Sequence, residues 1–295
     1  MKKIKILIPV YNDWKSVHKL LENIDIQISN WDADVSVFIV NDASTTEKTF
    51  SKLTFKKIKI VKIINMKKNK GHARCNAAGM KFLNEKEDFD HVILMDGDGE
   101  DRPEELSLFF NKSRDNPSKV VTANRIERSE GLLFKIFYEC HKILTYIFTG
   151  KLIKFGNYSC LPKEAVSKLV KESCIWSSFS GSVAKIIVNR DSIPSIRGKR
   201  YFGPSQMNFF GLLTHSLSIM GVFRVSVVIR SILFLIFYIF FIFNNISFIS
   251  MIPVLAILIF VFCVIKISLR ENIAELNSSL ENIESIEVLS TPDGR

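Results

Sequence analysis

The chain has 295 residues, and its 40 basic against 30 acidic side chains give a net charge of +10 at pH 7. Such a charge suits an anionic partner, either a phosphorylated substrate or a membrane surface, but no basic stripe is interleaved with aromatic residues, which argues against a nucleic-acid binder. The five cysteines are scattered without a C-x-x-C pair, which argues against a structural zinc site and a disulfide framework.

Apolar runs in the first part of the chain predict short buried strands at residues 5–10, 35–40, 58–64, 92–95 and 120–123. Helical patterns lie between them, at about 17–24, 73–83 and 104–110. This alternation predicts an α/β fold in which a mostly parallel sheet is covered by helices on both faces. The chain has no Gly-rich phosphate loop, which argues against a dehydrogenase or a P-loop enzyme.

Polar residues follow three of these strands, at residues 11–13, 41–44 and 96–101. In open α/β sheets, ligands bind at the carboxyl ends of the strands, so we expect these polar groups to meet in one cleft. Asn and Asp at strand ends are also ordinary turn residues.

The third of these segments carries four acids within six positions, namely Asp96, Asp98, Glu100 and Asp101. Two aspartates one residue apart can hold a hard divalent cation through oxygen ligands, and the cation can bridge the phosphates of a nucleotide. The alternative is a solvated acidic turn after a strand.

Two largely apolar segments, residues 225–243 and 250–267, have about the length needed to cross a bilayer. Arg224, Arg230, Lys266 and Arg270 flank their far ends, and the turn between them is uncharged. The positive-inside rule therefore predicts a hairpin in the cytoplasmic membrane, with both ends and the preceding domain in the cytoplasm. Two buried helices of a soluble core are the alternative, but runs such as residues 232–243 have no polar face.

We expect four parts: an α/β domain (1–205), an interfacial amphipathic helix (206–223), the membrane hairpin (224–270) and a polar tail (271–295). The helix would present one stripe of Asn208, Gly211, His215 and Ser218 and another of Phe209, Leu213, Leu217 and Met220. An ordinary connecting helix is the alternative. The tail is predicted to be frayed or loosely helical.

Several segments resemble family 2 glycosyltransferases with the GT-A fold, in the matching order: I-L-I-P-V-Y-N, V-F-I-V-N-D-A-S-T, N-K-G-H-A-R-C-N-A-A-G and M-D-G-D-G-E-D-R-P-E-E. Within that family the chain is most similar to the polyprenyl-phosphate (dolichol-phosphate mannosyltransferase-like) branch. Further similar segments are A-N-R-I-E-R-S-E-G-L-L-F-K-I-F-Y, F-G-N-Y-S and R-G-K-R-Y-F-G-P-S-Q-M-N, followed by the apolar hairpin.

The resemblance implies a nucleotide site. It assigns base and ribose contacts to Pro9, Tyr11, Asn12, Asn41 and Asp42, although a helix cap is an alternative for Asn41 and Asp42. It places Gly71 and Arg74 beside the nucleotide, where Arg74 would pair with a phosphate or with Asp96. His72 is predicted equally as a packed or surface histidine and as a ligand contact.

The resemblance assigns the metal and diphosphate position to Asp96 and Asp98, with Asp98 as the direct ligand of Mg²⁺ or Mn²⁺. The cation would neutralise the charge that develops on the leaving nucleoside diphosphate. Glu100 stands where the family often has Gln.

The acceptor region of the family falls at residues 155–159, where the polar residue is Asn157 rather than an Asp that can act as base. A lipid phosphate is already ionised and needs cations instead. The candidate cations are Arg125, Arg128, Arg197, Lys199 and Arg200. For the last three, simple anchoring to anionic lipid is an alternative.

We therefore expect an inverting, metal-dependent glycosyltransferase that moves a hexose from a UDP- or GDP-sugar to a polyprenyl phosphate. A saccharide hydroxyl as acceptor and a catalytically inactive membrane scaffold are the alternatives. Homo-oligomer formation is left open.

Overall fold

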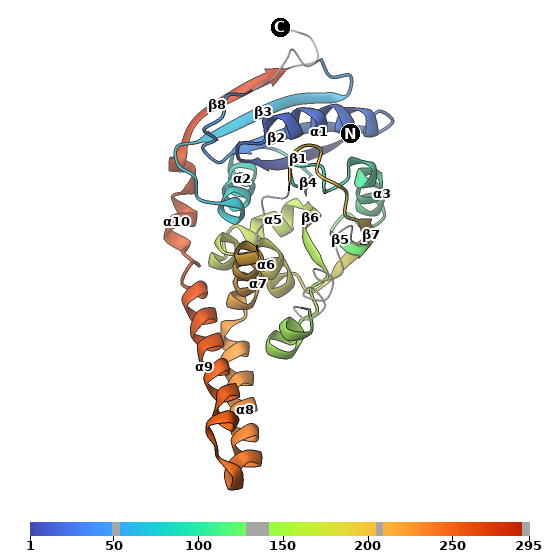
Figure 1. Cartoon of the computed structure of the whole chain (residues 1–295). Coiled ribbons are helices and arrows are strands. Elements are labelled where there is room, and N and C mark those ends of the chain that lie inside the picture. Colours follow the sequence, from blue (N-terminus) through green and yellow to red (C-terminus); the bar gives the residue numbers. More distant parts are fainter. Residues whose placement is uncertain (49–53, 128–141, 205–208, 291–295) are drawn as a thin grey trace.

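The computed structural model describes residues 1–48, 54–127, 142–204 and 209–290 (Figure 1). Its centre is an eight-stranded sheet with the order β7-β5-β6-β4-β1-β2-β3-β8. The strands are β1 (Lys2–Val10), β2 (Ala33–Asn41), β3 (Ile58–Met66), β4 (His91–Leu94), β5 (Val120–Glu127), β6 (Phe155–Pro162), β7 (Arg190–Ile196) and β8 (Ile283–Ser290).

The sheet is mixed. β1 lies between β2 and β4 and is parallel to both, β3 extends this parallel group, and β5 is parallel to β7. β6 runs antiparallel to β4 and β5, and β8 runs antiparallel to β3. The expected α/β fold with a mostly parallel sheet is confirmed, because four of the seven described pairings are parallel.

Helices cover both faces of the sheet. They are α1 (Trp14–Gln27), α2 (His72–Lys86), α3 (Leu106–Asp115), α5 (Lys163–Leu169) and α6 (Phe179–Ile186). Side chains of β1 alternate between two buried clusters, with Ile6 and Ile8 packing on the α1 side and Leu7 on the α2 side. This alternation explains why β1 reads as a continuous apolar run, since both of its faces are buried.

Two long apolar helices, α8 (Arg224–Ile242) and α9 (Phe248–Ser268), run side by side away from the sheet (Figure 1). The helical segments that contain them have mean hydropathies of 2.6 and 3.0 and are only 11% buried within the protein. By length and composition both can cross a membrane, and their exposure distinguishes them from core helices of a soluble domain.

The helix before the hairpin differs from the prediction. α7 (Phe209–Val222) packs against α6 and α9, and in its second half Ser218 from the expected polar stripe and Met220 from the apolar stripe are both buried. The two predicted stripes therefore do not separate buried from exposed side chains in this half of α7, and its place at a membrane surface stays a prediction.

The tail, predicted to be frayed or loosely helical, is helical in its first part but not frayed over residues 271–290. After α9 the chain forms α10 (Ile273–Asn277) and a 3-10 turn (Ser279–Asn282), and then enters the sheet as β8 beside β3. In Figure 1 the red β8 lies along the pale blue β3, although these strands are far apart in the sequence. β8 mixes polar and apolar residues, and Glu284, Ile286 and Val288 on one of its faces are exposed, as suits an edge strand.

Candidate active site

A cavity of about 1000 Å³ opens at the carboxyl ends of β1, β2 and β4, where the three predicted polar segments meet. Residues from all three segments line it, including Tyr11, Asp42, Asp96 and Asp98. Gly211 of α7 also contributes, so the cavity reaches the helix that leads into the apolar hairpin. The prediction of one shared cleft is confirmed.

The acidic loop after β4 folds back on itself. The backbone N–H of Asp96 donates to Asp101 Oδ2 at 2.9 Å, and the N–H of Glu100 donates to Asp98 Oδ1 at 3.0 Å. Gly99 has φ +89, a backbone conformation that side chains disfavour, and a Cβ there would lie 2.6 Å from the Tyr201 ring. The tight loop gathers its carboxylates at the cavity floor.

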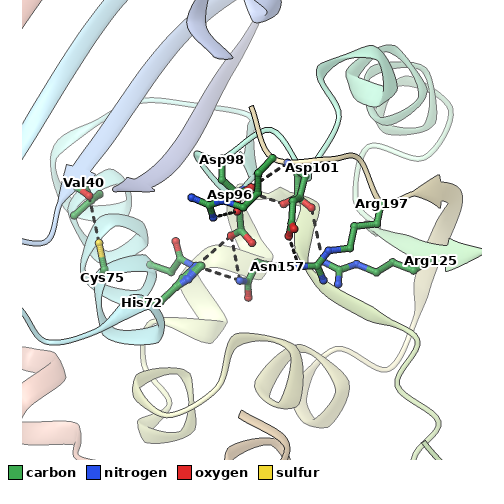
Figure 2. Close-up of polar contacts among 12 residues, drawn as sticks. Val40, His72, Cys75, Asp96, Asp98, Asp101, Arg125, Asn157 and Arg197 are labelled. Carbon is green, nitrogen blue, oxygen red and sulfur yellow. Dashed lines mark hydrogen bonds and ion pairs between the residues drawn. The ribbon is translucent and has the colours of Figure 1, made fainter. Parts of the chain in front are cut away.

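Arginines from two other segments pair with these carboxylates. Arg200 donates to both Asp98 and Asp13, and Arg197 pairs with Glu100. Arg125 of β5 lies 3.8 Å from Asp101 (Figure 2). Three of the predicted acceptor-binding cations therefore contact the acidic loop, while Lys199 is exposed and Arg128 lies outside the described residues.

The negative charge of the acidic loop is not fully balanced by these arginines. Burial, followed by the negative charge of Asp96, raises the pKa of Asp98 to about 6. Burial and then Asp96 also raise the pKa of Asp101 to about 8, against the opposing effect of Arg125. A cation bound among these oxygens would favour their ionised forms.

The donor set fits a divalent cation that is shared with a ligand. Among the residues that the structure describes, no three His, Cys, Asp or Glu side chains are grouped to hold a metal ion. Asp96 and Asp98 supply two carboxylates, and Mg²⁺ is commonly bound by one or two carboxylates together with substrate phosphates.

His72, at the start of α2, for which the sequence left a ligand contact and a packed or surface position open, contacts the acidic loop. Its Nε2 lies 3.1 Å from Asp96 Oδ1, and Asn157 of β6 donates to the same oxygen at 3.4 Å (Figure 2). Of the two partners predicted for Arg74, Asp96 is wrong, and a phosphate stays a prediction. Arg74 instead donates to the carbonyl of Lys70 and stacks over the Trp176 ring.

Two of the residues predicted to contact the nucleoside, Asn12 and Asn41, form hydrogen bonds with other parts of the protein. Asn12, which has φ 55, accepts hydrogen bonds from the N–H groups of Thr45 and Thr46. Buried Asn41 donates to Asn65 and accepts from the N–H of Ser44. No helix begins at residues 41–48, so neither Asn41 nor Asp42 is a helix cap.

Asp42 is 4% exposed and lines the cavity. Its two carboxylate oxygens accept from the backbone N–H groups of Lys70 and Gly71, at 2.9 and 2.8 Å. The loop before α2 is thus fixed against the end of β2. Pro9, Tyr11 and Gly71 line the same side of the cavity, and Tyr11 is half exposed.

Comparison with known proteins connects this site to sugar transfer. Residues 5–169 match the model of glycosyl transferase family 2. The chain is 24% identical over 220 residues to an undecaprenyl-phosphate 4-deoxy-4-formamido-L-arabinose transferase of Klebsiella pneumoniae (strain 342). That alignment covers 72% of this chain and 65% of the relative, so the chain spans slightly less than two thirds of the relative's length.

Solved structures share the fold. A glucosyl-3-phosphoglycerate synthase from Mycobacterium tuberculosis, crystallised with Mn²⁺ and UDP, superposes with a TM-score of 0.53 at 10% identity over 76% of this chain and 80% of that one. A mannosyl-3-phosphoglycerate synthase from Rubrobacter xylanophilus superposes with a TM-score of 0.50 at 11% identity, covering 75% and 72%. At such identities the likeness concerns the fold alone.

Proposed function

Because the chain belongs to glycosyl transferase family 2, we propose that it moves a sugar from a nucleotide donor to the phosphate of a polyprenyl lipid at a membrane. The observation that carries this proposal is the acidic loop of Asp96 and Asp98, which lies in the cavity and pairs with Arg200. An acidic loop short of positive charge suits a metal-bound diphosphate, and an adjacent arginine suits a second anionic substrate.

The donor would bind along the β1 and β2 side of the cavity. Asp42 and Tyr11 are the groups there that suit a nucleoside, because a carboxylate accepts from a base N–H or a ribose hydroxyl and an aromatic ring packs on a base. Asp96 and Asp98 would hold Mg²⁺ or Mn²⁺. When bound, the cation would neutralise the charge of the leaving diphosphate. The Mn²⁺ in the glucosyl-3-phosphoglycerate synthase crystal is in keeping with a divalent cation as cofactor.

The acceptor would be a phosphate that is already ionised. Next to Asp96 stands the amide of Asn157, which cannot take a proton from a hydroxyl as a carboxylate would. A polyprenyl phosphate does not require that step, and Arg197 and Arg200 can position its charge. The undecaprenyl-phosphate transferase among the relatives supports this acceptor.

A saccharide hydroxyl is the second candidate acceptor. The observation in its favour is His72, because its imidazole lies 3.1 Å from Asp96 in the cavity and an imidazole nitrogen can accept a proton from a hydroxyl. In that case His72 would be the general base, and the hairpin would serve only as an anchor.

The membrane part of the proposal rests on the hairpin and its surroundings. β8 follows α9 and joins the same sheet as the strands before α8, so both ends of the hairpin lie on one side of any membrane that it crosses. A helical segment at residues 142–149 contacts α8, where Arg230 donates to the carbonyl of Ile147. Ile143 and Tyr146 of that segment are 58% and 56% exposed. These apolar side chains suit the bilayer surface next to the hairpin.

The test uses membranes that contain the overexpressed full chain. Polyprenyl phosphate, Mg²⁺ or Mn²⁺ and labelled UDP- or GDP-hexoses are added one donor at a time, and lipid-soluble label is counted. Asp98→Asn is the inactive variant, and Asp115→Asn, an exposed aspartate at the end of α3, is the matched control.

Lipid-soluble label from one donor, lost in Asp98→Asn and kept in Asp115→Asn, would support the proposal and identify the donor. Metal-dependent nucleotide binding without lipid-soluble label would favour the hydroxyl acceptor. In that case His72→Gln should abolish transfer to a saccharide. Absence of nucleotide binding would refute the proposal.

A further inference from the structure

The tail that follows the membrane hairpin contacts the loop between β3 and α2, which lies next to the candidate nucleotide site. The carbonyl of Asn282 accepts from the N–H of Lys67 at 2.7 Å, and the Asn282 side chain donates to the carbonyl of Lys68 at 3.2 Å. The carbonyl of Glu281 accepts from Lys67 Nζ at 2.8 Å. The tail thus binds the first half of the loop mainly through backbone groups.

Glu275 of α10 contacts the second half of this loop and a buried tryptophan. Its Oε2 accepts from Trp176 Nε1 at 3.0 Å and lies 3.9 Å from Lys70 Nζ. Trp176 is 3% exposed, and Arg74 of α2 stacks on its ring. Leu276, the neighbour of Glu275, is fully buried in the same apolar cluster as Trp176. The carboxylate of Glu275 is therefore held in place by the packing of α10.

The loop that the tail holds is the one that Asp42 binds. The N–H groups of Lys70 and Gly71 donate to Asp42, and Asp42 and Gly71 both line the large cavity. The tail also reaches the end of β2 by a second route, because Glu287 and Ser285 of β8 accept from Asn65, which in turn accepts from Asn41.

The tail is joined directly to the hairpin. Glu271, located between α9 and α10, pairs at 2.7 Å with Arg224 at the start of α8. Its side chain is 5% exposed. The base of the hairpin and α10 are therefore connected by a few residues and one ion pair.

We propose that Glu275 is a positioning residue, through which the segment after the membrane hairpin holds the Lys67–Gly71 loop and Asp42 in the geometry that binds a nucleoside. The part of this inference that concerns nucleotide affinity rests on the proposed function. Without the Glu275 carboxylate, Lys70 and Trp176 each lose a partner, and the N–H groups of Lys70 and Gly71 should separate from Asp42 more often.

The test compares full-length Glu275→Ala, Glu275→Gln and Glu284→Ala with the wild type in detergent. Glu284 is an exposed acid in β8, so its replacement removes the same charge from the same tail. Hydrogen exchange at the Lys70 and Gly71 amides is measured without ligand. The affinity for UDP and GDP with Mg²⁺ is measured separately.

We expect Glu275→Ala to increase exchange at these two amides and to weaken nucleotide binding about tenfold, the equivalent of one hydrogen bond to a charged group. Glu275→Gln keeps an acceptor for Trp176 and should recover part of both effects, whereas Glu284→Ala should behave as the wild type. Transfer, once donor is saturating, should retain its kcat because the acidic loop is untouched.

Unchanged exchange at Lys70 and Gly71 in a folded Glu275→Ala protein would overturn the inference, whatever the affinity. So would increased exchange with wild-type nucleotide affinity. If the wild type binds no nucleotide while exchange still responds to Glu275, the proposed function fails and the tail remains the support of this loop. If Glu275→Ala does not fold, hydrogen exchange and nucleotide affinity are measured on Glu275→Gln instead, and the same outcomes support or overturn the inference.

Discussion

The two sides of the cavity differ in the contacts that hold their side chains in place. On the β1 and β2 side, Asn12 and Asp42 bind backbone N–H groups of neighbouring loops. On the side of the acidic loop, Asp98 and Asp101 also accept from backbone N–H groups, but Arg197 and Arg200 add ion pairs between side chains. Hydrogen bonds to backbone fix a surface before any ligand arrives, whereas ion pairs between side chains can be exchanged for a metal ion or a phosphate.

The largest effect should come from the acidic loop. Asp98→Asn is expected to reduce kcat by about 10³-fold, because charge stabilisation by a metal ion contributes several kcal/mol. The thermal midpoint should change by only about 2 °C, since burial already disfavours the charged form of Asp98. Transfer kinetics and thermal unfolding of one preparation check both. If Asp98→Asn instead unfolded the protein, the acidic loop would be needed for stability as the β1 and β2 side is, and the contrast between the two sides would not hold.

The next effect concerns Arg200, which bridges Asp98 and Asp13. Arg200→Ala is expected to lower kcat/KM for polyprenyl phosphate about 100-fold, as for the loss of two charge-assisted contacts, and to change nucleotide affinity about twofold. Lys171→Ala, at an exposed lysine, is the matched control. Equal losses in lipid and nucleotide binding would show that the two sides do not act separately.

On the opposite side, Asp42→Asn should act on binding and stability together. The amide keeps one acceptor for the N–H groups of Lys70 and Gly71 but not two. We expect nucleotide affinity to fall about tenfold and the protein to lose about 2 kcal/mol of stability. Calorimetric titration and denaturant unfolding measure these changes. Full stability with lost affinity would make Asp42 a ligand contact only.

The smallest effects are expected from replacing one glycine on each side of the cavity. Gly71 and Gly99 have nearly equal φ values of +90 and +89, so alanine adds the same backbone strain of about 1 kcal/mol at either position. A Cβ at Gly71 meets nothing within 4 Å, whereas one at Gly99 meets the Tyr201 ring. Gly99→Ala should therefore lower the thermal midpoint by more than Gly71→Ala does. The reverse order would contradict this account.

The features that the sequence predicts correctly are local ones. The run before Asp96 is apolar because β4 is buried on both faces, and the acids begin where the strand ends. The hairpin is similarly visible because a lipid-facing helix needs an uninterrupted apolar surface.

The features that the sequence does not reveal depend on distant partners. β8 is an edge strand with polar and apolar residues on both faces, and its place depends on β3, which precedes it by more than 200 residues. The pairing of His72 rather than Arg74 with Asp96 depends on how α2 is rotated against the sheet. α7 is apolar almost all round, and only the packing of α6 and α9 shows which of its turns are buried.

The position of β8 has a consequence for how the protein is made. The edge of β3 stays open while α8 and α9 emerge from the ribosome, and it is covered only when the segment beyond them has been synthesised. Both apolar helices are thus synthesised before the sheet can be completed. A chain that stops within the hairpin would therefore keep the edge of β3 unpaired, even though every strand that lines the cavity is already present.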